Sequence, residues 1–187
     1  MKNNKNSGFT LIELVVVIVI LAVLAVAAIP RFMSYQRDAQ LARADAAFAS
    51  FKNSVQLYHS KWLTQGEPNG VVAYGQGDIY PSKAGYPISV DEAPRVPTSE
   101  DQPTIRGEDC VKLWNALTQT DLTIRAQHEG SGHVLPSNTD IVSWYTGNDE
   151  CYYYYTPSFT IEEKLPILYY LPQTGELRQT KEGASSE

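Results

Sequence analysis

Hydrophobic and polar positions divide the chain into stretches with different patterns. The first stretch is an almost unbroken apolar run. From Phe9 to Ile29 the residues are apolar, apart from Thr10 and one acid, Glu13. As a helix this run would be about 31 Å long, close to the thickness of a bilayer's hydrocarbon core, about 30 Å. The run therefore predicts a membrane-spanning helix.

The second stretch is amphipathic and begins after Pro30. Its apolar residues recur at alternating spacings of three and four, which predicts one stripe on a helix over 31–66 that ends near Gln65-Gly66. The stripe contains Leu41, Ala44, Phe48, Phe51, Val55, Tyr58 and Trp62. Because proline lacks an N–H and clashes with the preceding turn, we expect a kink at Pro30 within one helix from about Phe9 to Thr64. A dimeric coiled coil is the alternative, but these bulky aromatic residues favour packing beneath a sheet.

The third stretch, 67–187, has the composition of a globular head, with glycine, proline and aromatic residues in place of alanine. Alternation and turn signals predict strands at Val71–Tyr74, Leu122–Ala126, Asp140–Tyr145, Cys151–Thr156, Leu165–Leu171 and Glu176–Thr180. We expect the last four to form an antiparallel meander that covers the helical stripe. A short helix is predicted at Glu108–Leu117, an irregular segment at Ala84–Gly107 and a turn at Gly75–Asp78. The expected fold class is α+β, a long kinked N-terminal helix packed against an antiparallel β-meander head.

Glu13 and the residues before the apolar run narrow the range of functions that the chain can have. Residues 1–8 are mostly polar, contain Lys2 and Lys5, and end in Gly8. A secretory signal, cut after the run near Ala25, Ala27 or Ala28, is one interpretation. However, an acid near the end of a membrane helix costs up to about 3 kcal/mol, and this cost predicts a partner charge.

In order and spacing, these residues resemble the N-terminus of type IV pilins and their pseudopilin relatives. The resemblance implies that prepilin peptidase cuts between Gly8 and Phe9 and that the new amino terminus of Phe9 is methylated. Residues 1–8 would then be a cleaved leader and 9–30 the transmembrane and filament-core helix. Glu13 would pair with the Phe9 amine of a neighbouring subunit, so Phe9, Glu13 and Pro30 are the expected assembly residues. No cofactor or metal is implied.

Within this family the run FTLIELVVVIVIL, followed by Pro30-Arg31-Phe32, is similar to the mannose-sensitive haemagglutinin (MSHA) pilins of Gram-negative bacteria. The stretch Val55–Trp62 and the aromatic strand at Cys151 favour a minor pilin of that system. The resemblance implies an inner-membrane anchor with a periplasmic head, then an extracellular pilus for surface attachment. Implied partners are other pilin subunits, prepilin peptidase, the inner-membrane assembly machinery, the membrane itself, and a host or abiotic surface.

Two alternatives remain open at this point. A type II secretion pseudopilin shares the same N-terminal pattern and would form a short periplasmic fibre. A membrane-tethered periplasmic enzyme would use the helix only as an anchor and would need a catalytic constellation in the head. The sequence supports no enzyme: no metal-ligand spacing or activated serine motif occurs. His128, Glu129 and His133 could hold a metal, but polar residues of an exposed loop are the favoured interpretation.

The two cysteines and the net charge bear on the stability of the head and on its binding partners. Cys110 and Cys151 are the only cysteines, and an even count in a domain beyond the membrane favours one disulfide over two buried thiols. The formal charge is −6, and losing Lys2 and Lys5 with the leader would leave −8. An acidic chain with scattered basic residues gives no strong signal for nucleic-acid binding.

Overall fold

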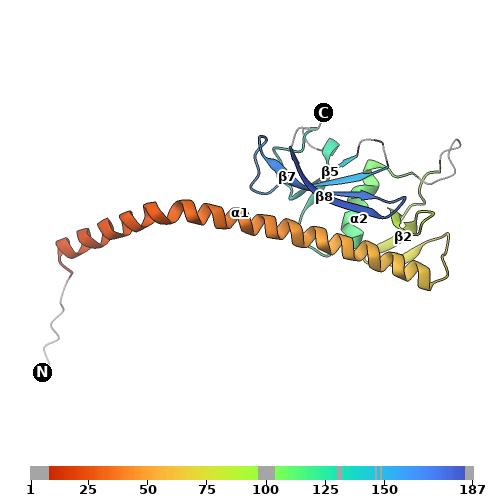
Figure 1. Cartoon of the computed structure of the whole chain (residues 1–187), viewed down its shortest axis with the longest axis horizontal. Coiled ribbons are helices and arrows are strands. Elements are labelled where there is room, and N and C mark those ends of the chain that lie inside the picture. Colours follow the sequence, from red (N-terminus) through yellow and green to blue (C-terminus); the bar gives the residue numbers. More distant parts are fainter. Residues whose placement is uncertain (1–8, 97–103, 130–131, 146, 148, 184–187) are drawn as a thin grey trace, which may run out of the picture. The chain divides into compact units, whose positions relative to one another are not determined.

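A computed structural model describes residues 9–96, 104–129, 132–145, 147 and 149–183. The chain divides into two compact units, Met1–Gln40 and Leu41–Glu187. One long helix, α1, spans Leu11–Thr64, and the remaining helices and strands belong to the second unit (Figure 1). Gly8 lies outside the described residues.

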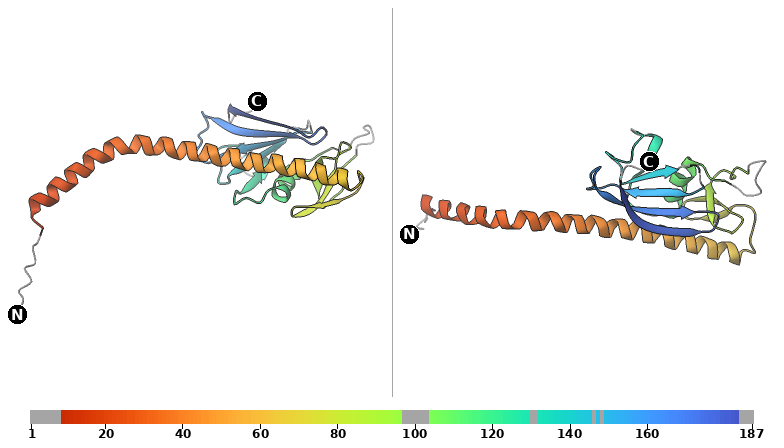
Figure 2. Two further views of the ribbon diagram at one scale, coloured as in Figure 1. Left: turned by 60° about the horizontal axis from the view of Figure 1, so that its bottom comes forward. Right: turned by 45° about the horizontal axis from the view of Figure 1, so that its top comes forward.

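Helix α1 continues through Pro30 without a break, as the sequence predicts. Within the first unit the helix curves along its length (Figure 2). The helix continues past Pro30 although a proline removes one backbone donor. All described side chains from Phe9 to Ile29 are exposed in the single chain. The helix ends where expected: Gly66 has φ +81°, and the Gly66 N–H donates to the Leu63 carbonyl.

In the second unit, the apolar stripe of α1 is the spine of the hydrophobic core. Its fully or nearly fully buried members are Ala44, Phe48, Phe51, Val55, Tyr58 and Trp62, and the neighbouring Ala47 is buried beside them. The Phe51 ring lies 5.5 Å from the ring of Trp114, 5.1 Å from that of Tyr153 and 5.5 Å from that of Tyr170. The stripe therefore packs beneath a sheet, as predicted, and is not left free for a coiled-coil partner.

The sheet above the stripe has five strands in the order β4-β5-β6-β7-β8. Strands β5 (Ile141–Tyr145), β6 (Cys151–Tyr155), β7 (Lys164–Leu171) and β8 (Glu176–Gly183) form the predicted antiparallel meander. Strand β4 (Ile124–Ala126) pairs parallel to β5. A short 3-10 turn, η1 (Gln127–Glu129), follows β4.

A second, three-stranded sheet corrects two of the sequence expectations. Strands β1 (Val72–Tyr74), β2 (Gly77–Pro81) and β3 (Pro87–Val90) pair antiparallel in sequence order. The turn expected at Gly75–Asp78 is confirmed only at Gly75-Gln76, because Gly77 and Asp78 already pair with β1. The segment expected to be irregular contains β3. Short strands that include glycine and proline lack the alternation on which sequence analysis depends.

Helix α2 (Gly107–Leu117) matches the predicted short helix and is joined to the sheet covalently. Cys110 of α2 and Cys151 of β6 form a disulfide, with their Cα atoms 5.6 Å apart. The Tyr153 hydroxyl also donates a 2.8 Å hydrogen bond to the Cys110 carbonyl. At the start of α2, the Asp109 carboxylate accepts a 2.7 Å hydrogen bond from the Arg106 N–H, which caps the helix.

Candidate functional site

The first turn of α1 is built around the predicted assembly acid. Thr10 immediately precedes the helix, and Glu13 lies in its first turn. The Glu13 carboxylate oxygen Oε2 accepts a 2.8 Å hydrogen bond from the Thr10 N–H and a 2.7 Å bond from the Thr10 hydroxyl. In return, the Thr10 Oγ accepts a 3.3 Å bond from the Glu13 N–H.

This reciprocal pattern is a capping box, in which the N-cap hydroxyl and the acid three residues later satisfy each other's backbone donors. It fixes the start of the helix at Thr10 and holds the Glu13 carboxylate beside the helix N-terminus, where the helix dipole favours a negative charge. Thr10 is a candidate site residue that the sequence interpretation did not single out. The signal was available, because a Thr-x-x-Glu spacing immediately before an apolar run is the pattern of this motif.

The predicted processing residues lie immediately before this box. Phe9 directly precedes Thr10, and its side chain is 81% exposed. Gly8 is outside the described residues, so the Gly8–Phe9 junction as a cleavage site stays a prediction. Pro30 is within α1, seventeen positions after Glu13 in the sequence.

Between Glu13 and Pro30 the helix surface is continuously apolar. Within the described part of the chain, α1 is the one helix long and apolar enough to cross a membrane, and its most hydrophobic 18-residue window is wholly unburied. Such a surface is unstable in water, because apolar area left exposed forfeits about 25 cal/mol per Å². The first unit therefore requires lipid or neighbouring helices around it.

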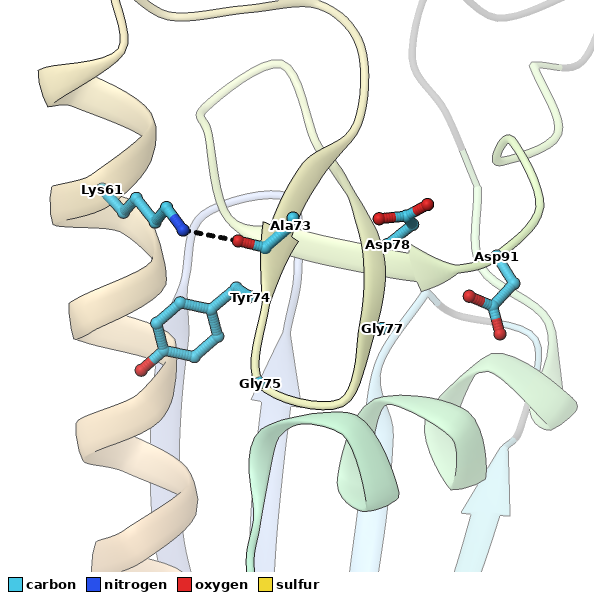
Figure 3. Close-up of a pocket in the computed structure, with 7 residues that line it drawn as sticks. All are labelled: Lys61, Ala73, Tyr74, Gly75, Gly77, Asp78 and Asp91. Atoms are coloured by element: carbon cyan, nitrogen blue, oxygen red, sulfur yellow. Dashed lines mark hydrogen bonds between the residues drawn. The ribbon is translucent and has the colours of Figure 1, made fainter.

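In the part of the head that the structure describes, the hollows and polar clusters are held by structural hydrogen bonds. One hollow, about 560 Å³, lies beside the β1–β2 hairpin of the head and is lined by Lys61, Ala73, Tyr74, Gly75, Gly77, Asp78 and Asp91 (Figure 3). The Lys61 Nζ donates to the Ala73 carbonyl at 2.6 Å, so this amine is engaged by the backbone. Among the described residues, no group of three histidine, cysteine or acidic side chains is placed to hold a metal ion.

The loop considered for metal binding is held by local hydrogen bonds. Glu129 accepts a 3.1 Å bond from the Ala126 N–H, and the buried Arg125 guanidinium donates to the His133 carbonyl at 3.0 Å. Arg125 also donates to the carbonyls of Ala126 and Gln127. These bonds give Glu129 and Arg125 a structural role in ordering the loop that follows β4.

Comparison with known proteins identifies the same N-terminal segment. Residues 3–29 match the family described as "Prokaryotic N-terminal methylation motif". No curated protein and no solved structure matches the chain. The motif, the apolar helix and the disulfide support a type IV pilin-like or pseudopilin-like protein processed by prepilin peptidase. The motif implies pilin subunits and that peptidase as partners, and it fits a single-pass anchor that later enters a pilus.

Proposed function

We propose that this chain is a minor structural subunit of an MSHA-like type IV pilus. Prepilin peptidase cuts it between Gly8 and Phe9, the Phe9 amine is methylated, and the subunit polymerises through 9–30 for surface attachment. The observation that carries the proposal is the match of residues 3–29 to the methylation motif, which coincides with a helix start built around Glu13. Under this proposal, the leader is cytoplasmic and the head is periplasmic before assembly.

The geometry of the capping box suggests how Glu13 directs assembly. Both Thr10 hydrogen bonds end at Oε2, so we assign the other oxygen, Oε1, to the Phe9 amine of the neighbouring subunit. That pairing replaces two unpaired buried charges with one pair. Removing one partner of a buried pair typically costs about 3 to 5 kcal/mol, so the pair acts as a register lock between subunits.

The role of the head is to present a folded surface on this polymer. Its core and disulfide couple α1 residues from Leu41 to Trp62 to α2 and β6. The MSHA-like assignment depends on the run FTLIELVVVIVIL and on Pro30-Arg31-Phe32, and the minor assignment on Val55–Trp62 and the aromatic strand at Cys151. No catalytic role is proposed for any residue of the head.

Mass spectrometry of purified surface fibres tests the proposal directly. We expect the chain as a minor component that begins at N-methylated Phe9 and carries a closed Cys110–Cys151 bridge. A Glu13→Ala variant should be absent from fibres, whereas Glu13→Asp should be incorporated at a reduced level. A mature chain that begins at Met1, or normal incorporation of Glu13→Ala, would contradict the proposal.

The same motif match equally supports a type II secretion pseudopilin, and the fibre experiment separates the two. A pseudopilin would be processed at the same junction but would remain in the cell envelope, absent from sheared surface fibres. Antibodies against the head would then label the periplasm only. In that case the processing and Glu13 predictions stand, and the surface-attachment role does not.

A further inference from the structure

The apolar run of the first unit is bounded by a charge at each end. Glu13 and Arg31 are eighteen positions apart, and no charged residue lies between them. At the helical rise per residue this separation is about 27 Å, slightly less than a hydrocarbon core of about 30 Å. Each charge can therefore reach an interface only if the helix stands close to the membrane normal.

The residues after Pro30 have the composition of a membrane interface. Phe32 is 63% exposed and Tyr35 is 65% exposed, although both are large aromatic side chains. Tyr35 lies three residues after Phe32 and four after Arg31, so the three side chains are neighbours on the helix surface. Tyrosine has one apolar and one polar end and concentrates at headgroup level, phenylalanine buries its ring at the edge of the hydrocarbon, and arginine pairs with phosphate. We call Arg31, Phe32 and Tyr35 the collar.

We propose that the collar docks on the headgroups of anionic phospholipids and fixes the depth of the unassembled subunit. This inference rests on the proposed function, which places the first unit in a membrane. With Arg31 at the phosphate layer of one leaflet, Glu13 reaches the opposite interface, where its carboxylate stays hydrated and capped by Thr10. Glu13 then enters hydrocarbon only during extraction, when the Phe9 amine of a neighbour replaces the water.

Charge complementarity favours anionic lipid over other occupants of this surface. The acid nearest to Arg31 along the chain is Asp38, seven positions later and about 10 Å further along the helix axis. The interfacial layer beyond the hydrocarbon is only about 5 to 8 Å thick on each side. When Arg31 lies at the lipid phosphates, Asp38 therefore lies beyond the interfacial layer.

Lipid selectivity of the reconstituted full chain tests the proposal. Lys2 and Lys5 would attract anionic lipid on the opposite leaflet, so the measurement uses a Lys2→Gln/Lys5→Gln background. The chain is placed in nanodiscs of phosphatidylcholine, and spin-labelled phosphatidylglycerol is compared with spin-labelled phosphatidylcholine at the protein surface. We expect Arg31→Gln to lower the preference for phosphatidylglycerol about fivefold, the value of one interfacial cation. Arg31→Lys should retain the preference.

The control is Arg95→Gln, which removes an exposed head charge and should leave the preference unchanged. An unchanged lipid preference in Arg31→Gln would overturn the proposal. An equal loss of preference in Arg95→Gln would also overturn it, because the preference would then depend only on the net charge of the chain. If Arg31→Gln retained its lipid preference but failed to enter fibres, the collar would instead contact a protein of the assembly machinery. The lipid-preference measurements use no fibres formed through Glu13, so the failure of this inference and the failure of the proposed function can be told apart.

Discussion

At the residue scale, Thr10 determines where the long helix begins. Replacing Thr10 with valine keeps the size of the side chain but removes the hydroxyl that bonds to Glu13 in both directions. Loss of an N-cap hydroxyl typically weakens a helix start by about 1 kcal/mol, so the amides of Glu13 and Leu14, which donate to Thr10, should exchange with solvent about fivefold faster. Hydrogen exchange of the full chain in micelles measures this directly.

Thr10→Ser is the matched control for this prediction, because serine retains the capping hydroxyl. If Thr10→Val and Thr10→Ser exchange at the same rate, the capping box does not hold the helix start. The Glu13 carboxylate is then oriented by something other than Thr10.

Phe51 packs against three aromatic rings of the core. It is fully buried, and its ring packs against Trp114, Tyr153 and Tyr170. Phe51→Ala should lower the free energy of unfolding by about 3 to 5 kcal/mol, because a large ring is deleted from a packed site. Urea denaturation followed by tryptophan fluorescence measures the change.

Leu57 on the same helix gives the comparison for this prediction. Its side chain is 59% exposed, so Leu57→Ala should change the free energy of unfolding by less than about 0.5 kcal/mol. Equal effects of the two substitutions would mean that the stripe of α1 does not form the core of the head.

At the scale of elements, the disulfide links helix α2 to strand β6 across a sequence separation of 41 residues. In the chain-entropy account, closing a loop of this length stabilises the fold by about 4 kcal/mol. The double variant Cys110→Ser/Cys151→Ser should therefore unfold at a clearly lower urea concentration than the parent chain. Adding reductant should lower the midpoint of the parent and leave that of the variant unchanged. A reductant-insensitive parent would show that the bridge does not form.

The helices and strands show which sequence signals were sufficient to predict the fold. The stripe from Leu41 to Trp62 predicted the helix correctly, because it has a regular period and a single buried face. The meander was predicted from apolar and aromatic runs separated by turn signals, although β6 and β7 are buried on both faces. Strands β2 and β3 were missed. Only part of β2 alternates, and β3 is buried on both faces and begins at Pro87, so neither carries a periodic signal.

In the candidate site, too, the sequence predicts some features and the structure alone shows others. The apolar run and its lone acid point to Glu13 without a structure, since an acid in such a run needs a reason. The partner that holds its carboxylate, Thr10, was missed although the Thr-x-x-Glu spacing signals it, and the structure identifies it by starting the helix at Leu11. The parallel pairing of β4 with β5 depends on the path of the intervening loop, which local patterns do not encode.

At the scale of the whole molecule, buried tyrosines should make the head less stable as the pH becomes alkaline. Tyr58, Tyr153 and Tyr170 are fully buried, and their hydroxyls donate to the carbonyls of Ile79, Cys110 and Pro87. Burial raises the pKa of each phenol above its ordinary value. Their ionisation therefore accompanies unfolding.

The sign of this dependence follows from proton linkage. Below a pH of about 10, folded and unfolded chains both hold these protons, so the contribution to stability is fully present. As the pH rises above about 10, the unfolded chain releases the protons and the folded chain keeps them. Stability should then fall by about 1.4 kcal/mol per pH unit for each buried tyrosine, until the pH passes the raised pKa.

Tyr58→Phe isolates one of these contributions. The variant loses the hydrogen bond to Ile79 and should be about 1 kcal/mol less stable at pH 8, while its alkaline loss of stability should be shallower by about 1.4 kcal/mol per pH unit. Urea unfolding between pH 8 and 11, with tyrosinate absorbance recorded in the same samples, gives both quantities. If parent and variant lose stability with the same slope above pH 10, Tyr58 ionises while the head is still folded, and the packing described around α1 is wrong at that residue.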